Sequence, residues 1–231
     1  MTMLVAAAAV FVLIHLLVSG TRVRDALTGA IGEGPYMGLF SLAEVACLVW
    51  LIMVFGPARA SAASAAPYWS VTPVTRDIQI VLQLLAFLLV VPGILTPNPT
   101  SIRQEGVLDK ADAVRGMVRI TRHPFLWGVA LWSAGHLIVD GSQPAIVLFG
   151  AFFVLSVLGP PSIDAKRKRK LGDRWNAFAA QTSSVPFAAI LAGRQKLSLS
   201  EIGWWRIALA VILWALVLWG HPYAFGVRAL P

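Results

Sequence analysis

The chain has 231 residues, of which 58% are hydrophobic and only 13% are charged, and its mean hydropathy is +0.74. A soluble domain would carry roughly 25% charged residues, so this composition excludes an ordinary soluble protein and indicates an integral membrane protein. The net charge of +8 comes from cations gathered in a few loops, which favours a topological explanation over nucleic-acid binding. A single cysteine, Cys47, excludes an intramolecular disulfide framework.

Apolar stretches along the chain predict an all-α, polytopic membrane helix bundle of about six transmembrane helices. A helix that crosses the hydrocarbon needs about 20 residues, and most of the stretches fit that length. They lie near residues 3–19, 36–55, 78–96, 124–140, 143–159 and 204–220.

The fourth and fifth stretches are short and are joined by Asp140-Gly141-Ser142, so we interpret them as a tight helical hairpin that Pro160-Pro161 closes. The first stretch lacks the basic start and the cleavage site of a signal peptide, and we expect it to remain as a span. No internal repeat or linker is evident, so residues 1–231 are expected to form a single domain.

The distribution of Lys and Arg predicts the orientation of the bundle. The loops at 20–35, 97–123 and 160–203 fall on one side, and the positive-inside rule places that side in the cytoplasm and both termini outside. Of the 19 basic residues, those on that side or just inside the last span are Arg22, Arg24, Arg103, Lys110, Arg115, Arg119, Arg122, Lys166, Arg167, Lys168, Arg169, Lys170, Arg174, Arg194, Lys196 and Arg206.

Two features of the 160–203 loop suggest contact with membrane lipid. The five consecutive cations from Lys166 to Lys170 are typical of a positive-inside anchor beside anionic headgroups. Leu171, Trp175 and Phe178 then follow at i, i+4 and i+7, which predicts a helix with one apolar face lying in the cytoplasmic interface. The segment from Pro186 is too short to span, and either re-enters the membrane or lies along the interface.

A few ionisable residues fall inside the apolar stretches, where such groups are costly and are functional candidates. His15 is near the cytoplasmic end of the first span, Glu44 is in the middle of the second, and His136 is toward the outer end of the fourth. For each histidine the alternatives are a ring hydrogen-bonded to a neighbouring helix, or a metal or haem ligand. Glu44 needs a partner or a proton, and by depth His15 is the nearest candidate.

Other polar and aromatic residues have simpler explanations. His123 precedes Pro124 at a helix start, and His221-Pro222 is consistent with a helix stop at the interface. Cys47 is interpreted as a small packing residue. Of the nine tryptophans, those deep enough to line a flat aromatic ligand pocket are Trp127, Trp132 and Trp214.

The densest pattern lies between residues 120 and 194. It consists of Thr121-Arg122-His123-Pro124, Gly128, Leu131-Trp132, His136, Gly141, Ile163-Asp164, Lys166-Arg167, Leu171-Gly172, Trp175, Thr182-Ser183, Pro186-Phe187-Ala188-Ala189 and Gly193-Arg194, with His15, Arg22, Arg24, His221-Pro222 and Phe225-Gly226 outside that region. With these residues the chain resembles the NnrU family of bacterial membrane proteins, which is similar to plant ζ-carotene isomerases.

The resemblance implies a membrane protein that binds haem b, with His15 and His136 as the two axial ligands. The activity it implies is either a redox role in nitrite and nitric oxide metabolism or isomerisation of a hydrophobic, carotenoid-like substrate. Glu44 would then orient His15, and Arg122, with Arg22 or Arg24, would pair with the propionates. It also implies the bacterial inner membrane.

Depth alone gives other ligand pairs, namely His15 with His123 and His136 with His221. A more distant likeness to isoprenylcysteine methyltransferase-type enzymes implies an S-adenosylmethionine-dependent membrane methyltransferase, with a pocket near His123, Asp164 and Trp175. A non-enzymatic membrane accessory factor is the third hypothesis.

Overall fold

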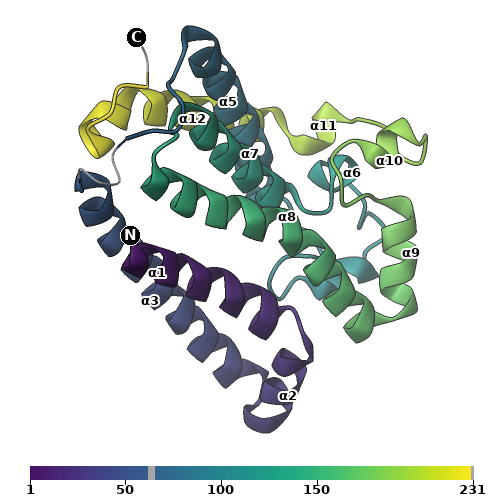
Figure 1. Cartoon of the computed structure of the whole chain (residues 1–231). Helices are drawn as coiled ribbons and strands as arrows, with labels where there is room; N and C mark the ends of the chain where they lie inside the picture. Colours follow the sequence, from purple (N-terminus) through teal and green to yellow (C-terminus); the bar gives the residue numbers. More distant parts are fainter. Residues whose placement is uncertain (62–65, 230–231) are drawn as a thin grey trace.

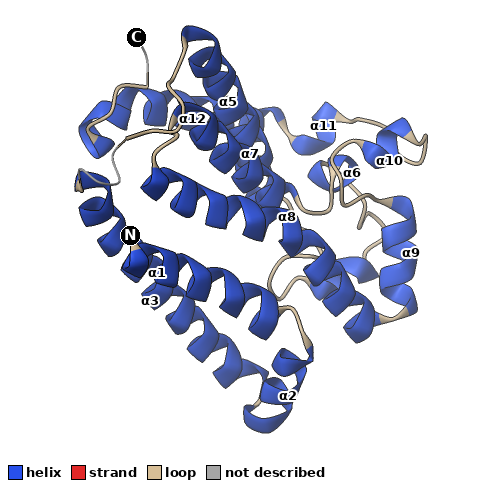
Figure 2. Ribbon diagram, in the orientation of Figure 1, coloured by secondary structure: helices blue, strands red, loops and turns tan. Residues whose placement is uncertain are grey.

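The computed structural model describes residues 1–61 and 66–229, and in this part of the chain every regular element is a helix (Figures 1 and 2). The elements in chain order are α1 (Thr2–Leu13), its π-helical continuation η1 (Ile14–Ser19), α2 (Arg22–Ile31), α3 (Glu33–Ala60), α5 (Pro73–Leu95), the 3-10 turn η2 (Glu105–Asp109), α6 (Met117–Ile120), α7 (Pro124–Val139), α8 (Gln143–Leu171), α9 (Asp173–Gln181), α10 (Ala188–Leu191), α11 (Leu199–Ile202) and α12 (Trp204–Phe225).

The predicted all-α membrane bundle is confirmed. Five helical segments are long and apolar enough to cross a membrane, namely α1 with η1, α3, α5, α8 and α12. The sixth apolar helix, α7, has 16 residues and is shorter than the usual span. Its neighbours on the two sides are α5 and α8.

The six apolar helices form a curved row in the order α12, α5, α7, α8, α1, α3, in which each packs against the next. Among the described residues no comparable packing joins α3 to α12, so the row is open on one side. The membrane helices alternate in direction along the chain, so the neighbours α8 and α1 in the row run parallel. The start of α1 and the end of α12 lie at the left of Figure 1, opposite α2, α6 and α9–α11, which agrees with the predicted placement of the first and last spans.

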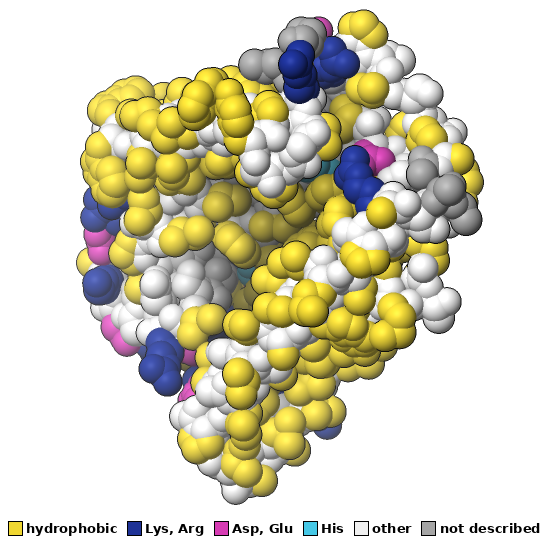
Figure 3. Space-filling view, turned by 90° about the vertical axis from the view of Figure 1, so that its left-hand side faces the viewer, with side chains coloured by type: hydrophobic (Ala, Val, Ile, Leu, Met, Phe, Trp, Pro, Cys, Tyr) yellow, Lys and Arg dark blue, Asp and Glu magenta, His cyan; other side chains and the backbone are white. Residues whose placement is uncertain are grey.

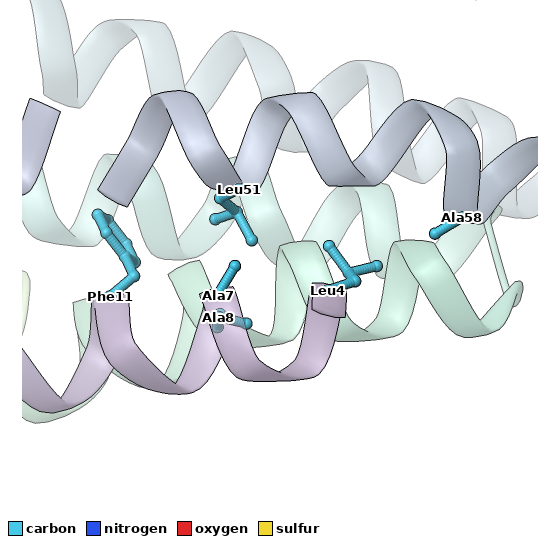
Figure 4. Close-up of a cluster of buried hydrophobic side chains, with 7 residues drawn as sticks. Leu4, Ala7, Ala8, Phe11, Leu51 and Ala58 are labelled. Atoms are coloured by element: carbon cyan, nitrogen blue, oxygen red, sulfur yellow. The ribbon is translucent and has the colours of Figure 1, made fainter. Parts of the chain in front are cut away.

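Small side chains let α1 approach α3 and α8 closely. Ala7 and Ala8 of α1 are buried between Leu4 and Phe11, and this face meets Leu51 of α3 and Ala151 of α8 (Figure 4). Within a membrane, helices associate through close packing of this kind, because lipid tails are as apolar as the side chains themselves. Cys47 packs at the edge of this cluster with its thiol free, in agreement with its interpretation as a packing residue.

Glycines bring α7 against α5. A Cβ on Gly128 would lie 2.9 Å from the carbonyl oxygen of Ala86, and a Cβ on Gly135 would lie 2.7 Å from Nε2 of Gln83. Real Cβ atoms do not approach other atoms this closely, so a Cβ at Gly128 would have to displace the backbone of α5, whereas a Cβ at Gly135 would have to displace the ends of the Gln79 and Gln83 side chains. The helix that carries His136 is therefore held tightly to its neighbour.

The predicted end of the fifth span at Pro160-Pro161 is wrong, because α8 continues to Leu171. The two prolines remove backbone donors and disfavour an interior position. The helix nevertheless persists because its last turns are fixed by ion pairs to residues far away in the sequence. These pairs are Arg167–Glu105, Arg169–Asp25 and Lys170–Glu33. Gly172, with φ of +53°, then ends the helix.

These pairs also change the interpretation of the basic run from Lys166 to Lys170, because three of its cations bind carboxylates of the same chain. Arg167 is buried, and it donates to the carbonyls of Thr100 and Ser101 as well as to Glu105. Burial alone would raise the pKa of Glu105, but hydrogen bonds from its own backbone and from Arg167 lower that pKa to about 2. Most of this run therefore stabilises the fold rather than standing free for headgroups.

The helix predicted after the basic run is present as α9, but its apolar face does not point to lipid. Trp175 and Phe178 are buried, and they pack against Val118 with Leu108 and Val114 beside it. The predicted interfacial placement of this face is wrong because the 97–123 loop folds back to cover it. The short segment after Pro186 forms only the four-residue helix α10.

Candidate functional site

His15 lies in the π-helical end of the first span. The π-helix is rare in proteins, and where it occurs it is often part of a functional site. Its Nδ1 is 2.9 Å from the carbonyl oxygen of Phe11 and 2.9 Å from Oε2 of Glu44. The ring N–H donates to the carbonyl, because the two Glu44 oxygens have no well-aligned donor among the described residues. Glu44 is thus beside His15, as the sequence predicted.

His136 repeats this arrangement on α7. Its Nδ1 is 2.8 Å from the carbonyl oxygen of Trp132, one turn earlier, and its ring stacks on Phe149 of α8 at a centroid distance of 4.4 Å. In both histidines Nδ1–H is directed at the carbonyl of residue i−4, and no hydrogen bond to Nε2 is found among the described residues. This leaves the Nε2 lone pair available, which is the state of a neutral imidazole ligand.

Aromatic rings connect the two histidines across α8. The chain of contacts runs from His15 to Phe11, on to Phe152 of α8, then to Trp132, and ends at His136. The successive centroid distances are 4.7, 5.3, 5.5 and 4.9 Å. Figure 3 shows a hollow on the face viewed there, lined largely by hydrophobic side chains, with histidine surface visible inside it.

The opposite directions of the helices that carry His15 and His136 reduce the separation of the two imidazole rings along the helix axis. Phe11 and Trp132 face the same residue of α8, so His15 and His136 lie one turn beyond this level in opposite directions, about 11 Å apart along the axis. A helical side chain leans toward the N-terminus of its own helix, and both Nδ1 hydrogen bonds show this lean. Because α1 and α7 are antiparallel, the two rings lean toward each other.

Two glutamines that the sequence analysis did not select support His136. Gln83 of α5 donates to the carbonyl of Trp132, the same group that Nδ1 of His136 faces, and it also donates to Gln79. The spacing of Gln79 and Gln83, at i and i+4 in an apolar span, was the available signal. Gly135 lies against both amides and leaves room for them.

Arg122 and His123 belong to a different cluster, at the opposite end of α7. Arg122 donates to both carboxylate oxygens of Asp164, and Nε2 of His123 is 2.7 Å from Oδ1 of the same residue. Burial lowers the pKa of His123, so its ring is neutral and its Nε2–H donates to Asp164. His123 precedes His136 by 13 residues, or about 20 Å of helix, so Arg122 and His123 are not brought together with His136.

This second cluster joins the start of α7 to the loop after α9. The carbonyl of Arg122 accepts hydrogen bonds from Asn98 and Thr100, while its N–H donates to the carbonyl of Ser183. Trp127 donates to the carbonyl of Ser184, so its indole serves the same junction. The cluster therefore has the connectivity of a structural hub.

The remaining candidates are dispersed. His221 on α12 has Nδ1 within 2.8 Å of the carbonyl of Val227, and its ring contacts Phe225. Trp214 has a buried indole N–H with no partner among the described residues. Of the three deep tryptophans only Trp132 contacts a candidate ligand, His136.

Among the described residues, no group of three or more His, Cys, Asp or Glu side chains comes together to hold a metal ion. A haem iron needs only one or two protein ligands, because the porphyrin supplies the others. Two imidazoles on apolar helices, each with an Nε2 that has no hydrogen-bond partner among the described residues, fit such a group.

The fold and this pair of histidines define a polytopic helical membrane protein with a candidate cofactor site inside the bundle. The family model described as "NnrU protein" matches residues 3–229. The chain belongs to the NnrU family.

The curated relatives are plant proteins. The chloroplastic 15-cis-zeta-carotene isomerase of Zea mays is 29% identical over 106 residues, which are 45% of this chain and 29% of that protein. The protein of the same name from Arabidopsis thaliana is 28% identical over 106 residues, with the same coverage. The chain thus matches less than a third of each relative's length. No solved structure matches.

Proposed function

We propose that this membrane protein binds haem b between His15 and His136 and isomerises a conjugated, membrane-soluble polyene. The observation that carries the proposal is the matched state of the two imidazoles. Each directs Nδ1 at the carbonyl one turn earlier in its helix, and each has Nε2 without a hydrogen-bond partner among the described residues. The two imidazoles have the same hydrogen-bonding state and lie on antiparallel helices that flank α8, so they could bind haem from its two sides.

The surrounding side chains give each imidazole a defined orientation. The carbonyl of Phe11 and the carboxylate of Glu44 lie against Nδ1 of His15, while Phe149 stacks on His136. Groups of this kind fix the tautomer of a ligating histidine and raise its basicity. Haem, when bound, supplies an iron centre whose ligation depends on its oxidation state. The chain's own contribution is to hold two neutral rings and to exclude water with the aromatic side chains packed around them.

The polyene substrate is proposed from two lines of support. The hollow is largely hydrophobic, as a site for a long apolar molecule must be (Figure 3). The two plant relatives carry the name 15-cis-zeta-carotene isomerase. We extend that activity to this chain as a proposal, because the match covers only part of each protein.

Haem binding is tested by expressing the full chain with ample haem and measuring the haem-to-protein ratio and the visible spectrum after purification. We expect His15→Ala and His136→Ala each to remove most of the haem, and His221→Ala to retain it. His221 is the matched control because its Nδ1 also faces a backbone carbonyl of its own segment. Retention of haem in both of the first two variants, or loss only in His123→Ala and His221→Ala, would refute the assignment.

The reaction is tested separately. The haem-loaded protein in liposomes is supplied with 15-cis-ζ-carotene, under reducing and oxidising conditions, and the isomers are separated chromatographically. We expect conversion only with loaded protein and its loss in His136→Ala. A loaded protein that leaves the polyene unchanged would refute the isomerase proposal while leaving haem binding intact.

The alternatives draw less support from the geometry. Of the residues of the methyltransferase hypothesis, His123 and Asp164 are hydrogen-bonded to each other and Trp175 is buried in the protein. The accessory-factor hypothesis does not account for two histidines in matched states. A role in nitrite and nitric oxide metabolism and residence in the bacterial inner membrane with both termini periplasmic remain predictions from the family resemblance and the charge distribution.

A further inference from the structure

A second hollow lies on the side of the bundle that carries the basic loops. It is an open depression of about 440 Å³ between the end of α6 and the segment that links α10 to α11. The lining residues are Arg119, Gly193, Arg194, Gln195, Lys196, Ser198 and Glu201. Three of them are cationic and one is acidic, so the hollow has a net positive charge.

The cations of this hollow differ in how far they are already paired. Arg119 binds both oxygens of Glu201 and also donates to Gln195, so its charge and that of Glu201 offset each other. Their mutual hydrogen bond raises the pKa of Arg119 and lowers the pKa of Glu201, so both remain charged at neutral pH. Arg194 uses only Nη1, which donates to the carbonyls of Ala180 and Thr182. Among the described residues, the ammonium of Lys196 has no hydrogen-bond or ion-pair partner.

The rim of the hollow is apolar and open to the surroundings. Leu191 is 86% exposed and Leu197 is 50% exposed, and Trp204, the first residue of the membrane-crossing helix α12, is 65% exposed. Leucine and tryptophan exposed together at the start of a span are typical of residues at headgroup level, where a polar end faces water and an apolar body faces lipid. The cationic hollow therefore lies at the height of the headgroups.

We propose that this hollow binds the phosphodiester headgroup of an anionic phospholipid. The ammonium of Lys196 and the part of the Arg194 guanidinium not used by its backbone hydrogen bonds would face the phosphate, and the hydroxyl of Ser198 adds a donor. The acyl chains would lie along α12, whose apolar side chains are largely exposed, among them Ile212 and Leu216. A ligand with an anionic head and apolar tails matches both parts of this surface, whereas a soluble anion matches only the hollow.

The basic run from Lys166 to Lys170 is a second cationic surface on the same side of the bundle, and it differs from the hollow in how its charges are paired. It holds more positive charge than the hollow, but three of its members are paired with Glu105, Asp25 and Glu33. Lys168 of that run is exposed and has no such partner among the described residues, so it serves as a matched surface cation away from the hollow. Attraction to lipid through general charge would treat Lys168 and Lys196 alike.

The test uses the purified full chain in detergent and counts bound lipids by native mass spectrometry, with phosphatidylglycerol and phosphatidylcholine added in equal amounts. We expect the wild-type protein to retain phosphatidylglycerol preferentially, and Lys196→Glu to lower this preference at least about fivefold. Lys168→Glu, which changes the net charge equally, should leave the preference intact. Both side chains are exposed, so both variants should keep the wild-type melting temperature.

Equal losses in the two variants would show charge attraction without a site and would overturn the proposal, as would an unchanged preference in Lys196→Glu. Displacement of the bound lipid by millimolar inorganic phosphate would show a site for a soluble anion, and would also overturn it. None of these outcomes depends on haem, so the lipid site and the proposed function stand or fall separately.

Discussion

Gly128→Ala is the sharpest test of how α7 is positioned. The added Cβ would lie 2.9 Å from the carbonyl oxygen of Ala86, where ordinary contacts begin near 3.4 Å, so α7 must move from α5 by about 0.5 Å. The obstacle is the backbone of α5, which cannot rotate aside as a side chain would. Overpacking of this kind costs about 1–3 kcal/mol. We expect a melting temperature lower by roughly 2–10 °C, measured in detergent by tryptophan fluorescence.

The displacement should also reach the candidate site, because Trp132 and His136 follow Gly128 by one and two turns on α7. Haem retention should fall in parallel with stability. Gly150→Ala is the matched control, since a Cβ on Gly150 meets nothing within 4 Å and alanine favours the helix. An unchanged melting temperature in Gly128→Ala, or an equal decrease in both variants, would refute the close packing of α5 and α7.

Three further predictions concern the rest of the fold. Asp164→Ala leaves Arg122, whose side chain is 12% exposed, without its carboxylate, which should cost about 3–5 kcal/mol in denaturant unfolding. Any folded variant should keep the haem spectrum of the wild type, and loss of haem without loss of stability would contradict the structural role. Because the pKa of Glu105 is lowered from 4.5 to about 2, its pair with Arg167 stabilises the fold above pH 4.5, and this stabilisation is lost as the pH falls toward 2. Glu105→Gln should therefore remove that part of the pH dependence of the melting temperature. An unchanged pH profile in this variant would contradict the prediction. A C-terminal alkaline phosphatase fusion should be active and a C-terminal green fluorescent protein fusion dark, because the charge distribution places that end outside; the reverse pattern would overturn the topology.

Hydropathy was sufficient to predict the six apolar helices, because a helix surrounded by lipid must be apolar over most of its length. It could not predict where α8 ends. The extension beyond Pro160-Pro161 depends on ion pairs with Glu105, Asp25 and Glu33, residues that the sequence does not place near it. Proline propensity is a local preference, and here tertiary pairing overrides it.

The sequence was sufficient to select the main candidate residues of the site, but it predicted only in part which of them lie together. His15, Glu44 and His136 could be selected because ionisable groups are costly in hydrocarbon, and the structure places Glu44 beside His15. Arg122 and His123 could not be separated from them by sequence, because their partner Asp164 lies more than 40 residues further along the chain. Gln83 was missed because its role depends on facing the carbonyl of Trp132.

The same limit applies to α9. The positions of Trp175 and Phe178 predicted an apolar helix face, and that face exists. The sequence pattern does not distinguish whether such a face meets lipid or protein. Here the loop carrying Val118 covers it, so the surface left for lipid lies elsewhere, beside Lys196 and the start of α12.

The central claim is that His15 and His136 hold one haem from opposite faces. Electron paramagnetic resonance of the ferric, haem-loaded protein tests it most directly, because two imidazole ligands give a low-spin signal and one gives a high-spin signal. We predict a low-spin spectrum for the wild-type protein that becomes high-spin in whatever loaded protein survives in His15→Ala and in His136→Ala. A wild-type spectrum that is high-spin, or a low-spin signal that persists in both variants, would contradict the account.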